Sequence, residues 1–378
     1  MASSWLPPQG GRPGSGAKID VGILGATGVV GQHFVSLLAN HPWFRVTWLA
    51  ASERSAGKRY GDLPWRLAAA LPPDAAGLRV NALEEATTHP ASEIPALLFS
   101  GLDASVAGDA EVAFAKSGRL VVSNARNHRM DPLVPLLIPE VNPDHLGLLD
   151  AQQAARGWTG GIVTNPNCST VVVAMVLGAL RQFEPTRVIV TTLQALSGAG
   201  YPGVASLDAV GNVVPYIGGG EEEKIETETL KLLGTLERGA VRPADFVVSA
   251  TTTRVPVPDG HTIVMSIEFA AKPSIDDLTH ALASFTSEPQ TRTLPTAPAP
   301  PIVLHPGQDR PQPRLDVAYG GGMPVHCGRV RKCPVLGYKL VAMGHNVVRG
   351  AAGAALLNAE LIVARGMRVG SSAAIGAT

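Results

Sequence analysis

The sequence predicts an α/β fold divided into two domains. In the first part, KIDVGILGATGVVGQHFVSLLANHP reads as a strand, a glycine-rich turn and a helix, and strand and helix patterns then alternate as far as residue 123. Such alternation is typical of a parallel sheet covered by helices, as in a Rossmann-type domain. In the second part the strands are β-branched and two of them flank a short turn, which indicates antiparallel pairing.

The expected elements follow this division. In the first part we expect strands at 21–24, 44–50, 96–100 and 120–123, and helices at 29–38 and 107–116. In the second part we expect a buried helix at 171–180, a strand at 187–193, a strand pair at 246–255 and 262–269 around the turn 258–260, an extended proline-rich loop at 286–314 and a helix at 346–365.

Length and charge limit the classes of function. The 378 residues suffice for two domains, and 45% of them are hydrophobic, so a substantial core is available. The 31 basic and 31 acidic residues balance, which excludes a general electrostatic attraction to nucleic acid or to anionic membranes. The default class is therefore an enzyme or binder of small molecules.

The N-terminus and the cysteines indicate a cytoplasmic protein. Residues 1–17 read as a flexible tail rich in Gly, Pro and Ser, with no apolar stretch for a signal peptide, and no apolar run in the chain is long enough to span a membrane. The three cysteines, Cys168, Cys327 and Cys333, form no close pair typical of zinc or redox sites, which favours a reducing compartment. We expect no metal site, and we expect Cys327 and Cys333 to be structural.

The glycine-rich turn GATGVVG predicts a dinucleotide site. Its GxxGxxG spacing lies between a strand and a helix, where small residues let the backbone approach a pyrophosphate and the helix N-terminus supplies N–H groups. The alternative is a plain structural turn. The residues expected to contact the cofactor here are Gly25, Thr27, Gly28, Val29, Val30 and Gly31.

The end of the second strand bears on the choice of cofactor. Glu53 would accept hydrogen bonds from a ribose 2′-hydroxyl, which favours NAD. Four donors surround it and favour a 2′-phosphate instead, and with it NADP: Ser52, Arg54, Ser55 and Lys58. A solvated loop of mixed charge is the remaining alternative.

Cys168 is a candidate nucleophile. It lies in TNPNCST, directly before an apolar helix, and a thiolate at a helix N-terminus is stabilised by the helix dipole and by backbone N–H groups. Cysteine is also among the most often buried residues, so position alone leaves a buried structural thiol open.

A nucleophilic cysteine usually needs an acid or base, and His261 is the most suggestive histidine. It follows the turn PDG and lies seven residues beyond Arg254. In a regular hairpin these two positions would face opposite sides, but Pro256 and Pro258 interrupt the ladder, so the register is not readable. Taken singly, His261 is also compatible with an ordinary turn residue and Arg254 with a surface charge.

Two further segments offer binding groups. Glu221 and Lys224 follow three glycines near an expected helix start, although most such charged runs are solvated faces. Arg126 and Arg129 follow a strand end, where α/β sheets commonly bind ligands.

Together these segments resemble the aspartate-semialdehyde dehydrogenases, particularly their archaeal and fungal branch. The resemblance extends from about Lys18 to about Gly366 and rests on the order and spacing of its motifs: GILGATGVVGQ, ASERSAGKRY, PEVNPDH, NPNCST, QALSGAGYPG, EEEK, TTTRVPVPDGH and HNVVRGAAGAALLNAEL. The related acylglutamyl-phosphate reductases usually carry an aromatic residue after the cysteine, whereas Ser169 follows Cys168 here.

The resemblance implies a reaction. The family reduces L-aspartyl 4-phosphate to L-aspartate 4-semialdehyde with NADPH, reversibly and with release of phosphate, on the route to lysine, threonine, methionine and isoleucine. By its motifs, Cys168 would form a thioester, His261 would be the acid/base, and Gln194 would orient the intermediate. Arg254 and Glu221 would bind the substrate's carboxylate and ammonium groups.

The resemblance also implies the remaining contacts and the architecture. The phosphate would be bound by Lys224, Arg129 and Asn167, and the nicotinamide half of the cofactor by Ser197, Gly198 and Asn346. The chain would comprise an NADP-binding domain at 18–165 with 346–378, and an α+β catalytic and dimerisation domain with a mixed sheet at 166–345. A homodimer or homotetramer is expected.

Two other functions are compatible with parts of the sequence. A reductase of another acyl donor, such as malonyl-CoA, would share the cysteine, the histidine and the cofactor turn. Glu221, Lys224 and Arg129 favour an amino-acid phosphate over it. A catalytically silent NADP-binding sensor would have lost Cys168 or His261, and both are present.

Overall fold

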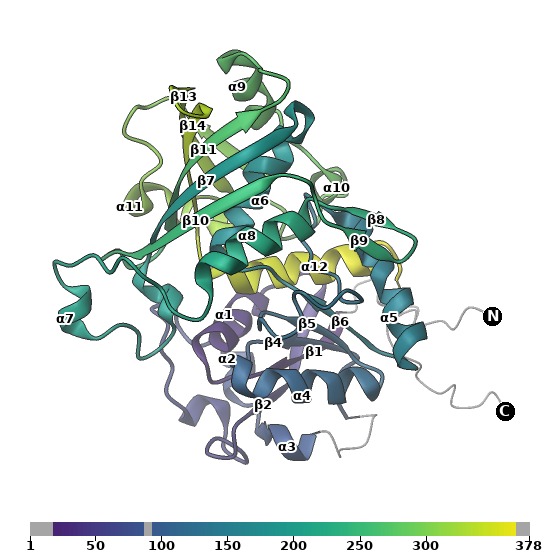
Figure 1. Ribbon diagram of the computed structural model, residues 1–378. Helices are drawn as coiled ribbons and strands as arrows, with labels where there is room; N and C mark the ends of the chain where they lie inside the picture. The colour runs from purple at the N-terminus through teal and green to yellow at the C-terminus, as the bar shows by residue number, and fades with distance from the viewer. Residues whose placement is uncertain (1–17, 87–92, 368–378) are drawn as a thin grey trace. The chain divides into compact units, whose positions relative to one another are not determined.

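The computed structural model describes residues 18–86 and 93–367, which fold into two compact units (Figure 1). The first unit comprises the chain up to Pro135, Leu146–Thr164 and the residues from Asn358 onward. The second comprises Leu136–His145 and Asn165–Leu357. Residues 1–17, expected to form a tail, lie outside the described residues. No helix within the described ranges is long and apolar enough to cross a membrane.

The first unit is built on a parallel six-stranded sheet in the order β3-β2-β1-β4-β5-β6. Its strands are β1 (Ile19–Leu24), β2 (Phe44–Ala51), β3 (Val80–Ala82), β4 (Leu97–Ser100), β5 (Leu120–Ser123) and β6 (Gly161–Thr164). Its helices are α1 (Val29–Leu38), α2 (Pro73–Ala76), α3 (Leu83–Ala86), α4 (Ala104–Lys116) and α5 (Leu148–Arg156). This strand order is that of the doubly wound dinucleotide-binding fold, so the expected fold class is confirmed.

The sheet of the first unit is buried at its centre, where β4 and β5 are short and mostly apolar. The four residues of β4 and of β5 are all buried, as parallel strands covered on both faces require. Leu98, Phe114 and Val121 share one core with Leu24 of β1. The order of the sheet reverses between β1 and β4, and ligands bind at such switch points, beyond the carboxyl ends of the strands.

The second unit has a mixed six-stranded sheet in the order β10-β7-β11-β14-β13-β12. Its strands are β7 (Pro185–Gln194), β10 (Val247–Arg254), β11 (His261–Phe269), β12 (Ile302–His305), β13 (Val325–Cys333) and β14 (Gly337–Gly344), and β8 (Thr235–Glu237) and β9 (Ala240–Arg242) form a separate ribbon. Its helices include α6 (Cys168–Leu180), α7 (Ser206–Ala209), α8 (Glu221–Leu232), α9 (Ile275–Ala283), α10 (Glu288–Thr291) and α11 (Pro313–Asp316).

Helix α6 is apolar all round, which is typical of a core helix. Every residue from Ser169 to Leu180 is buried, and the helix contacts β7, β11, β13 and β14 on one face of the sheet (Figure 1). Cys168 is the first residue of this helix. The core therefore holds the candidate nucleophile on a rigid support.

The expected hairpin between the strands at 246–255 and 262–269 is wrong. Strand β7 lies between them: β10 pairs with it in parallel and β11 pairs with it antiparallel. Pro256 and Pro258 lack the N–H groups that a continuous ladder needs, so the chain crosses the end of β7 instead of turning back beside β10. As a result Arg254 and His261 lie on opposite sides of Gln194, the last residue of β7.

Three other expectations need correction. The proline-rich stretch 286–314 is not one extended loop, because it contains α10 and the edge strand β12, which pairs in parallel with β13. The helix expected at 346–365 begins with a π-helical turn, Val348–Ala352, before α12 (Gly353–Ala364). Residues up to Leu357 belong to the second unit, so the unit boundary falls later than the expected 346.

Candidate active site

Asn167 shapes the start of helix α6. Its side-chain Oδ1 accepts hydrogen bonds from the backbone N–H groups of Ser169 (2.9 Å) and Thr170 (3.2 Å), which makes it an N-cap. Cys168 therefore occupies the first helical position, where the positive end of the helix dipole stabilises negative charge on sulfur.

A glycine leaves room for the backbone at Cys168. A Cβ added to Gly350, in the π-helical turn, would stand 2.6 Å from the Cβ of Cys168 and 3.0 Å from its Cα. Asn165 attaches the same turn to the cysteine loop, since its Nδ2 donates to the carbonyl oxygen of Ala351 (2.9 Å). π-Helical turns of this kind are frequent at functional sites.

His261 lies beside the thiol. It is the first residue of β11, it is fully buried, and its Nε2 is 3.2 Å from the Sγ of Cys168. The backbone N–H of Ala195 donates to Nδ1 (3.0 Å), so the neutral ring carries its proton on Nε2, facing the sulfur. Burial, followed by the positive charges of Arg254 and His345, lowers the pKa of His261 to about 3. The imidazole is therefore a neutral hydrogen-bond donor to Cys168 at neutral pH.

Arg254 adds a buried positive charge to the site. Its Nη1 donates to the carbonyl oxygen of Ala195 (2.7 Å). Burial lowers the pKa of this guanidinium, while the negative charges of Cys168 and Glu221 oppose that effect. A Cβ on Gly198 would stand 2.8 Å from Arg254 Nη1 and 3.0 Å from His261 Nε2. The turn at 196–199 can lie this close to both side chains only because residue 198 has none.

Glu221 connects the cysteine loop to helix α8. Its Oε1 accepts from Asn167 Nδ2 (2.8 Å) and Gln194 Nε2 (3.2 Å), and its Oε2 accepts from Lys224 Nζ (3.0 Å). Burial acts to raise the pKa of this carboxyl, but the charge of Lys224 and the hydrogen bonds from Asn167, Lys224 and Gln194 hold it below its usual value. The group is thus a buried carboxylate, able to attract an ammonium group.

The second unit therefore brings seven of the predicted residues together: Cys168, His261, Gln194, Arg254, Glu221, Lys224 and Asn167. Arg129 belongs to the first unit, where it is buried and its Nη2 donates to the carbonyl oxygen of Asn124 (2.7 Å). Arg126 is exposed and lies three residues before it.

The glycine-rich turn of the first unit lies at the switch point of the parallel sheet. Gly25 has φ +75°, and a Cβ there would stand 2.9 Å from the carbonyl oxygen of Gly101, the residue after β4. A Cβ on Gly31 would stand 2.2 Å from the carbonyl oxygen of Gly25. Both glycines are required by packing alone. Gly28, by contrast, is the N-cap of α1, where a helix N-terminus can receive a phosphate.

The loop after β2 presents its charges to solvent. Ser52, Glu53, Arg54 and Lys58 are exposed and Ser55 is half-buried. Lys58 Nζ donates to the carbonyl oxygen of Arg54 (2.8 Å), so the Arg54 guanidinium extends from a braced turn. The donors expected for a 2′-phosphate are accessible.

Asn346 is held between two turns of the second unit. Its Nδ2 donates to Ser197 Oγ (2.8 Å), and its Oδ1 accepts from the N–H of Gly260 (2.9 Å). Asn346 thereby ties the 196–199 turn to the turn that precedes His261.

Sequence reasoning missed several residues that build the site. Glu228, one turn beyond Ile225 on α8, accepts the backbone N–H of Asn167 (2.6 Å). Its spacing of seven from Glu221 would have placed it on the same helix face, but the charged run EEEKIETE reads as solvated. The Ala195 N–H and Gly350 carry no sequence signal, because their roles depend only on tertiary proximity.

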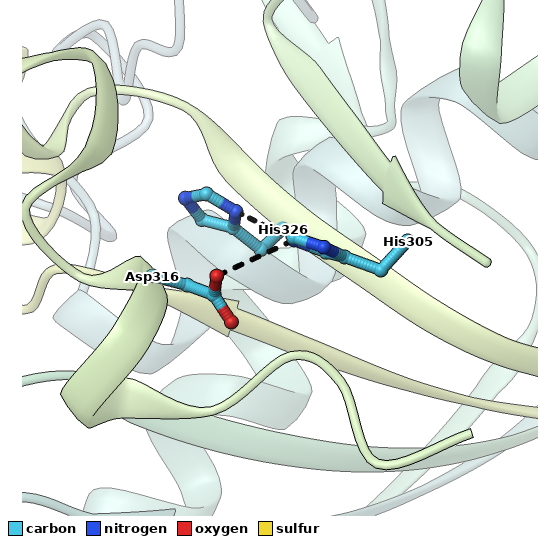
Figure 2. A group of neighbouring side chains, drawn as sticks. All are labelled: His305, Asp316 and His326. Atoms are coloured by element: carbon cyan, nitrogen blue, oxygen red, sulfur yellow. Dashed lines mark hydrogen bonds and ion pairs between the residues drawn. The ribbon is translucent and has the colours of Figure 1, made fainter. Parts of the chain in front are cut away.

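A histidine and aspartate cluster lies elsewhere in the second unit (Figure 2). His305 Nε2 is 3.0 Å from His326 Nδ1 and 3.9 Å from Asp316 Oδ1, a spacing compatible with metal ligands. Arg310, however, donates to both carboxylate oxygens of Asp316. A guanidinium that already neutralises the carboxylate opposes cation binding, and the cluster is better described as a hydrogen-bonded network.

Comparison with known proteins identifies both units. The family described as "Semialdehyde dehydrogenase, NAD binding domain" matches residues 20–149, and "Semialdehyde dehydrogenase, dimerisation domain" matches 177–349. The chain is 50% identical over 349 residues to the aspartate-semialdehyde dehydrogenase of Methanothermobacter thermautotrophicus, covering 91% of this chain and 99% of that protein. It is 48% identical over 361 residues to that of Cryptococcus neoformans, covering 93% and 98%.

A solved structure is also similar. Aspartate semialdehyde dehydrogenase with NADP from Candida albicans superposes with a TM-score of 0.84 at 39% identity, covering 92% of this chain and 99% of that one.

Proposed function

The chain belongs to the aspartate-semialdehyde dehydrogenase family, and we propose that Cys168 is the nucleophile of its reaction. The reaction is the NADPH-dependent reductive dephosphorylation of L-aspartyl 4-phosphate to L-aspartate 4-semialdehyde, in the aspartate-derived pathway of amino-acid biosynthesis. The observation that carries the proposal is the 3.2 Å approach of Cys168 Sγ to His261 Nε2, at a helix N-terminus and beside Arg254.

The geometry gives each group a step. The Cys168 thiolate attacks the acyl carbon, the bond from carbon to the phosphate oxygen breaks, and phosphate leaves a thioester on the enzyme. Bound NADPH supplies a hydride to the thioester carbonyl carbon. The resulting alkoxide re-forms the carbonyl group, the carbon–sulfur bond breaks, and the thiolate returns as the aldehyde leaves.

The resemblance implies an acid/base role for His261, and in these steps we assign it the part of a hydrogen-bond donor. Because the backbone N–H of Ala195 donates to Nδ1, the ring proton is on Nε2, where it faces the sulfur and stabilises the thiolate. The same N–H would also stabilise the negative charge that develops on the substrate's carbonyl oxygen. Burial lowers the pKa of His261 to about 3, so the neutral ring is a weak base and stays a donor.

Substrate recognition follows from charge. Arg254 and Glu221 form a pair of opposite charges that suits the carboxylate and ammonium groups of an amino acid. Lys224 and Asn167 border Glu221 and are assigned to the phosphate, with Arg129 of the first unit. Gln194, which donates to Glu221, orients the bound acyl group. Malonyl-CoA has no ammonium group for Glu221.

The cofactor contacts are assigned by unit. In the first unit, the glycine-rich turn receives the pyrophosphate, and Ser52, Arg54 and Ser55 receive the 2′-phosphate. In the second, Ser197, Gly198 and Asn346 are assigned to the nicotinamide half.

The second unit also offers a surface for a second copy of the chain. The outward side chains of the mixed sheet alternate with buried ones and include apolar residues, among them Val247 (65% exposed), Ile189 and Val264. The loop carrying α7 extends from the sheet (Figure 1) and exposes Leu207 (90%). Large apolar patches of this kind mark interaction surfaces. We assign them to the subunit interface of a cytoplasmic homodimer or homotetramer. This assembly takes a small-molecule substrate and phosphate and binds no nucleic acid.

One assay tests the function. Purified protein with aspartate semialdehyde, phosphate and NADP should generate NADPH absorbance, and omission of phosphate should abolish the signal. Cys168→Ala should remove turnover while NADP binding persists. Turnover of malonyl-CoA with NADPH, without activity on the semialdehyde, would contradict the assignment.

A further inference from the structure

Helix α8 directs carboxylates to two different parts of the second unit. Glu222 Oε1 accepts the backbone N–H of Thr252 (2.9 Å), and Glu226 Oε1 accepts that of Ala250 (2.9 Å). These two bonds attach the helix to strand β10. Glu221 and Glu228, two turns apart on the same helix, bond instead to Asn167.

Hydrogen bonds consequently hold Asn167 at its backbone N–H and at both polar atoms of its side chain. Glu228 Oε2 accepts its backbone N–H at 2.6 Å, Glu221 accepts from its Nδ2, and its Oδ1 caps helix α6. Both Asn167 (5% exposed) and Glu228 (2% exposed) are buried. A charge-assisted bond of this length between buried groups is among the stronger hydrogen bonds of a protein.

The bond from Glu228 bears directly on the nucleophile. The backbone N–H that it holds belongs to Asn167, the residue before Cys168. The close approach of Gly350 restricts the cysteine from another direction. A carboxylate near Cys168 does not stabilise a thiolate electrostatically. Its presence is explained by the position it imposes rather than by its charge.

We propose that Glu228 is a positioning residue, which fixes the Pro166–Asn167 peptide so that the sulfur of the next residue, Cys168, stays at the Nε2–H of His261. This inference rests on the proposed role of Cys168 as nucleophile. In this role Glu228 acts through the backbone N–H of Asn167.

Two substitutions separate position from charge. Glu228→Gln keeps the length and an acceptor oxygen but loses the charge, whereas Glu228→Asp keeps the charge but is one methylene too short to reach the amide. A positioning role predicts that Glu228→Asp lowers kcat by about 100-fold, because a displacement of ~1 Å at reacting atoms costs on that order. The kcat of Glu228→Gln should remain within about tenfold of that of the unsubstituted protein, since glutamine retains a weaker, uncharged hydrogen bond to the amide.

The readouts are kcat, the KM for aspartate semialdehyde and for phosphate, NADP affinity and the pH dependence of kcat. Both variants should leave the KM values, NADP affinity and the midpoint of the pH profile unchanged. Glu226→Gln is the matched control, because it weakens an equivalent bond from the same helix to β10 and should leave kcat unchanged.

Three results would overturn the inference. The first is full kcat in Glu228→Asp, and the second is a greater loss of kcat in Glu228→Gln together with a shifted pH midpoint, which would indicate a role for the charge. Loss of NADP affinity in both Glu228 variants would indicate a general structural role and would overturn it too. Cys168→Ala is measured in parallel. If that variant keeps its turnover, the proposed function fails; if it is inactive while Glu228→Asp is fully active, only the present inference fails.

Discussion

Cys168 leaves no room for a side chain at position 350, which is a glycine. A Cβ at 350 would stand 2.6 Å from the Cβ of Cys168, closer than real Cβ atoms approach one another. The π-helical turn at 348–352 and the start of α6 therefore fix each other's position. The buried, bidentate pair of Arg349 and Glu140 anchors the turn from its other side.

We expect Gly350→Ala to displace the thiol and to lower kcat by about 10- to 100-fold, since small misplacements at reacting atoms are costly. NADP binding should remain unchanged. Steady-state kinetics and NADP titration measure the two effects. Gly77→Ala is the control, because a Cβ at 77 meets nothing within 4 Å. Unaltered kcat in Gly350→Ala would show that the turn yields without moving the cysteine.

Replacement of Arg54 tests the 2′-phosphate assignment. Arg54→Ala should weaken NADPH binding by about tenfold, the value of one hydrogen bond to a charged group, and leave NADH binding nearly unchanged. Fluorescence titration with each cofactor measures the difference. Arg45→Ala, at the opposite end of β2 and paired with Asp20, is the matched control. Equal weakening of both cofactors would contradict the assignment.

The network around His326 predicts loss of stability in acid. Burial, followed by the charges of His305 and Arg310, lowers the pKa of His326 to about 4, below its unfolded value of 6.5. The unfolded chain therefore binds the proton first as the pH falls. The contribution of neutral His326 to the free energy of unfolding is therefore complete above pH 6.5 and is lost as the pH falls towards 4. His326→Gln should reduce the pH dependence of unfolding in this window by up to about 1.4 kcal/mol per pH unit.

Denaturant unfolding of the unsubstituted protein and of His326→Gln, at a series of pH values, measures this effect. An identical pH dependence in His326→Gln would show that the histidine is not responsible.

Glu111 predicts the opposite dependence in the first unit. Burial raises the pKa of this carboxyl to about 7, although hydrogen bonds from Ser100 and Ser123 and the charge of Arg129 act against it. The folded state then holds a proton that the unfolded chain releases near pH 4.5, so stability is complete below pH 4.5 and falls as the pH rises to about 7. Glu111→Gln should flatten the unfolding free energy across this range, and the same denaturant series tests it.

The exposed face of the mixed sheet predicts the assembly. Val264→Glu places a charge at the centre of β11 on the face assigned to the second copy, where two symmetry-related carboxylates would repel one another. We expect a shift from dimer to monomer in size-exclusion chromatography with light scattering. Val106→Glu replaces the same residue type at a more exposed position, on α4 of the first unit, and should leave the dimer intact. A dimer that survives Val264→Glu would place the interface elsewhere.

The sequence by itself determined the local features. The helix at 29–38 and the strand at 120–123 form as expected, since their apolar patterns and the glycine turn act over short distances. The motif resemblance identified the family and its cofactor, both confirmed by the comparisons. The nucleophilic role of Cys168 and the participation of His261 remain predictions, supported by the 3.2 Å distance between Sγ and Nε2.

Only the tertiary structure decided the arrangement around Cys168. The insertion of β7 between β10 and β11 places Gln194 between Arg254 and His261, against the expected hairpin. The proton position on His261 depends on the N–H of Ala195, and the hold on Asn167 depends on Glu228, which lies 61 residues away in the chain. Such contacts join backbone and side-chain groups that are distant in sequence, and local patterns of hydrophobicity and charge carry no record of which distant partner they meet.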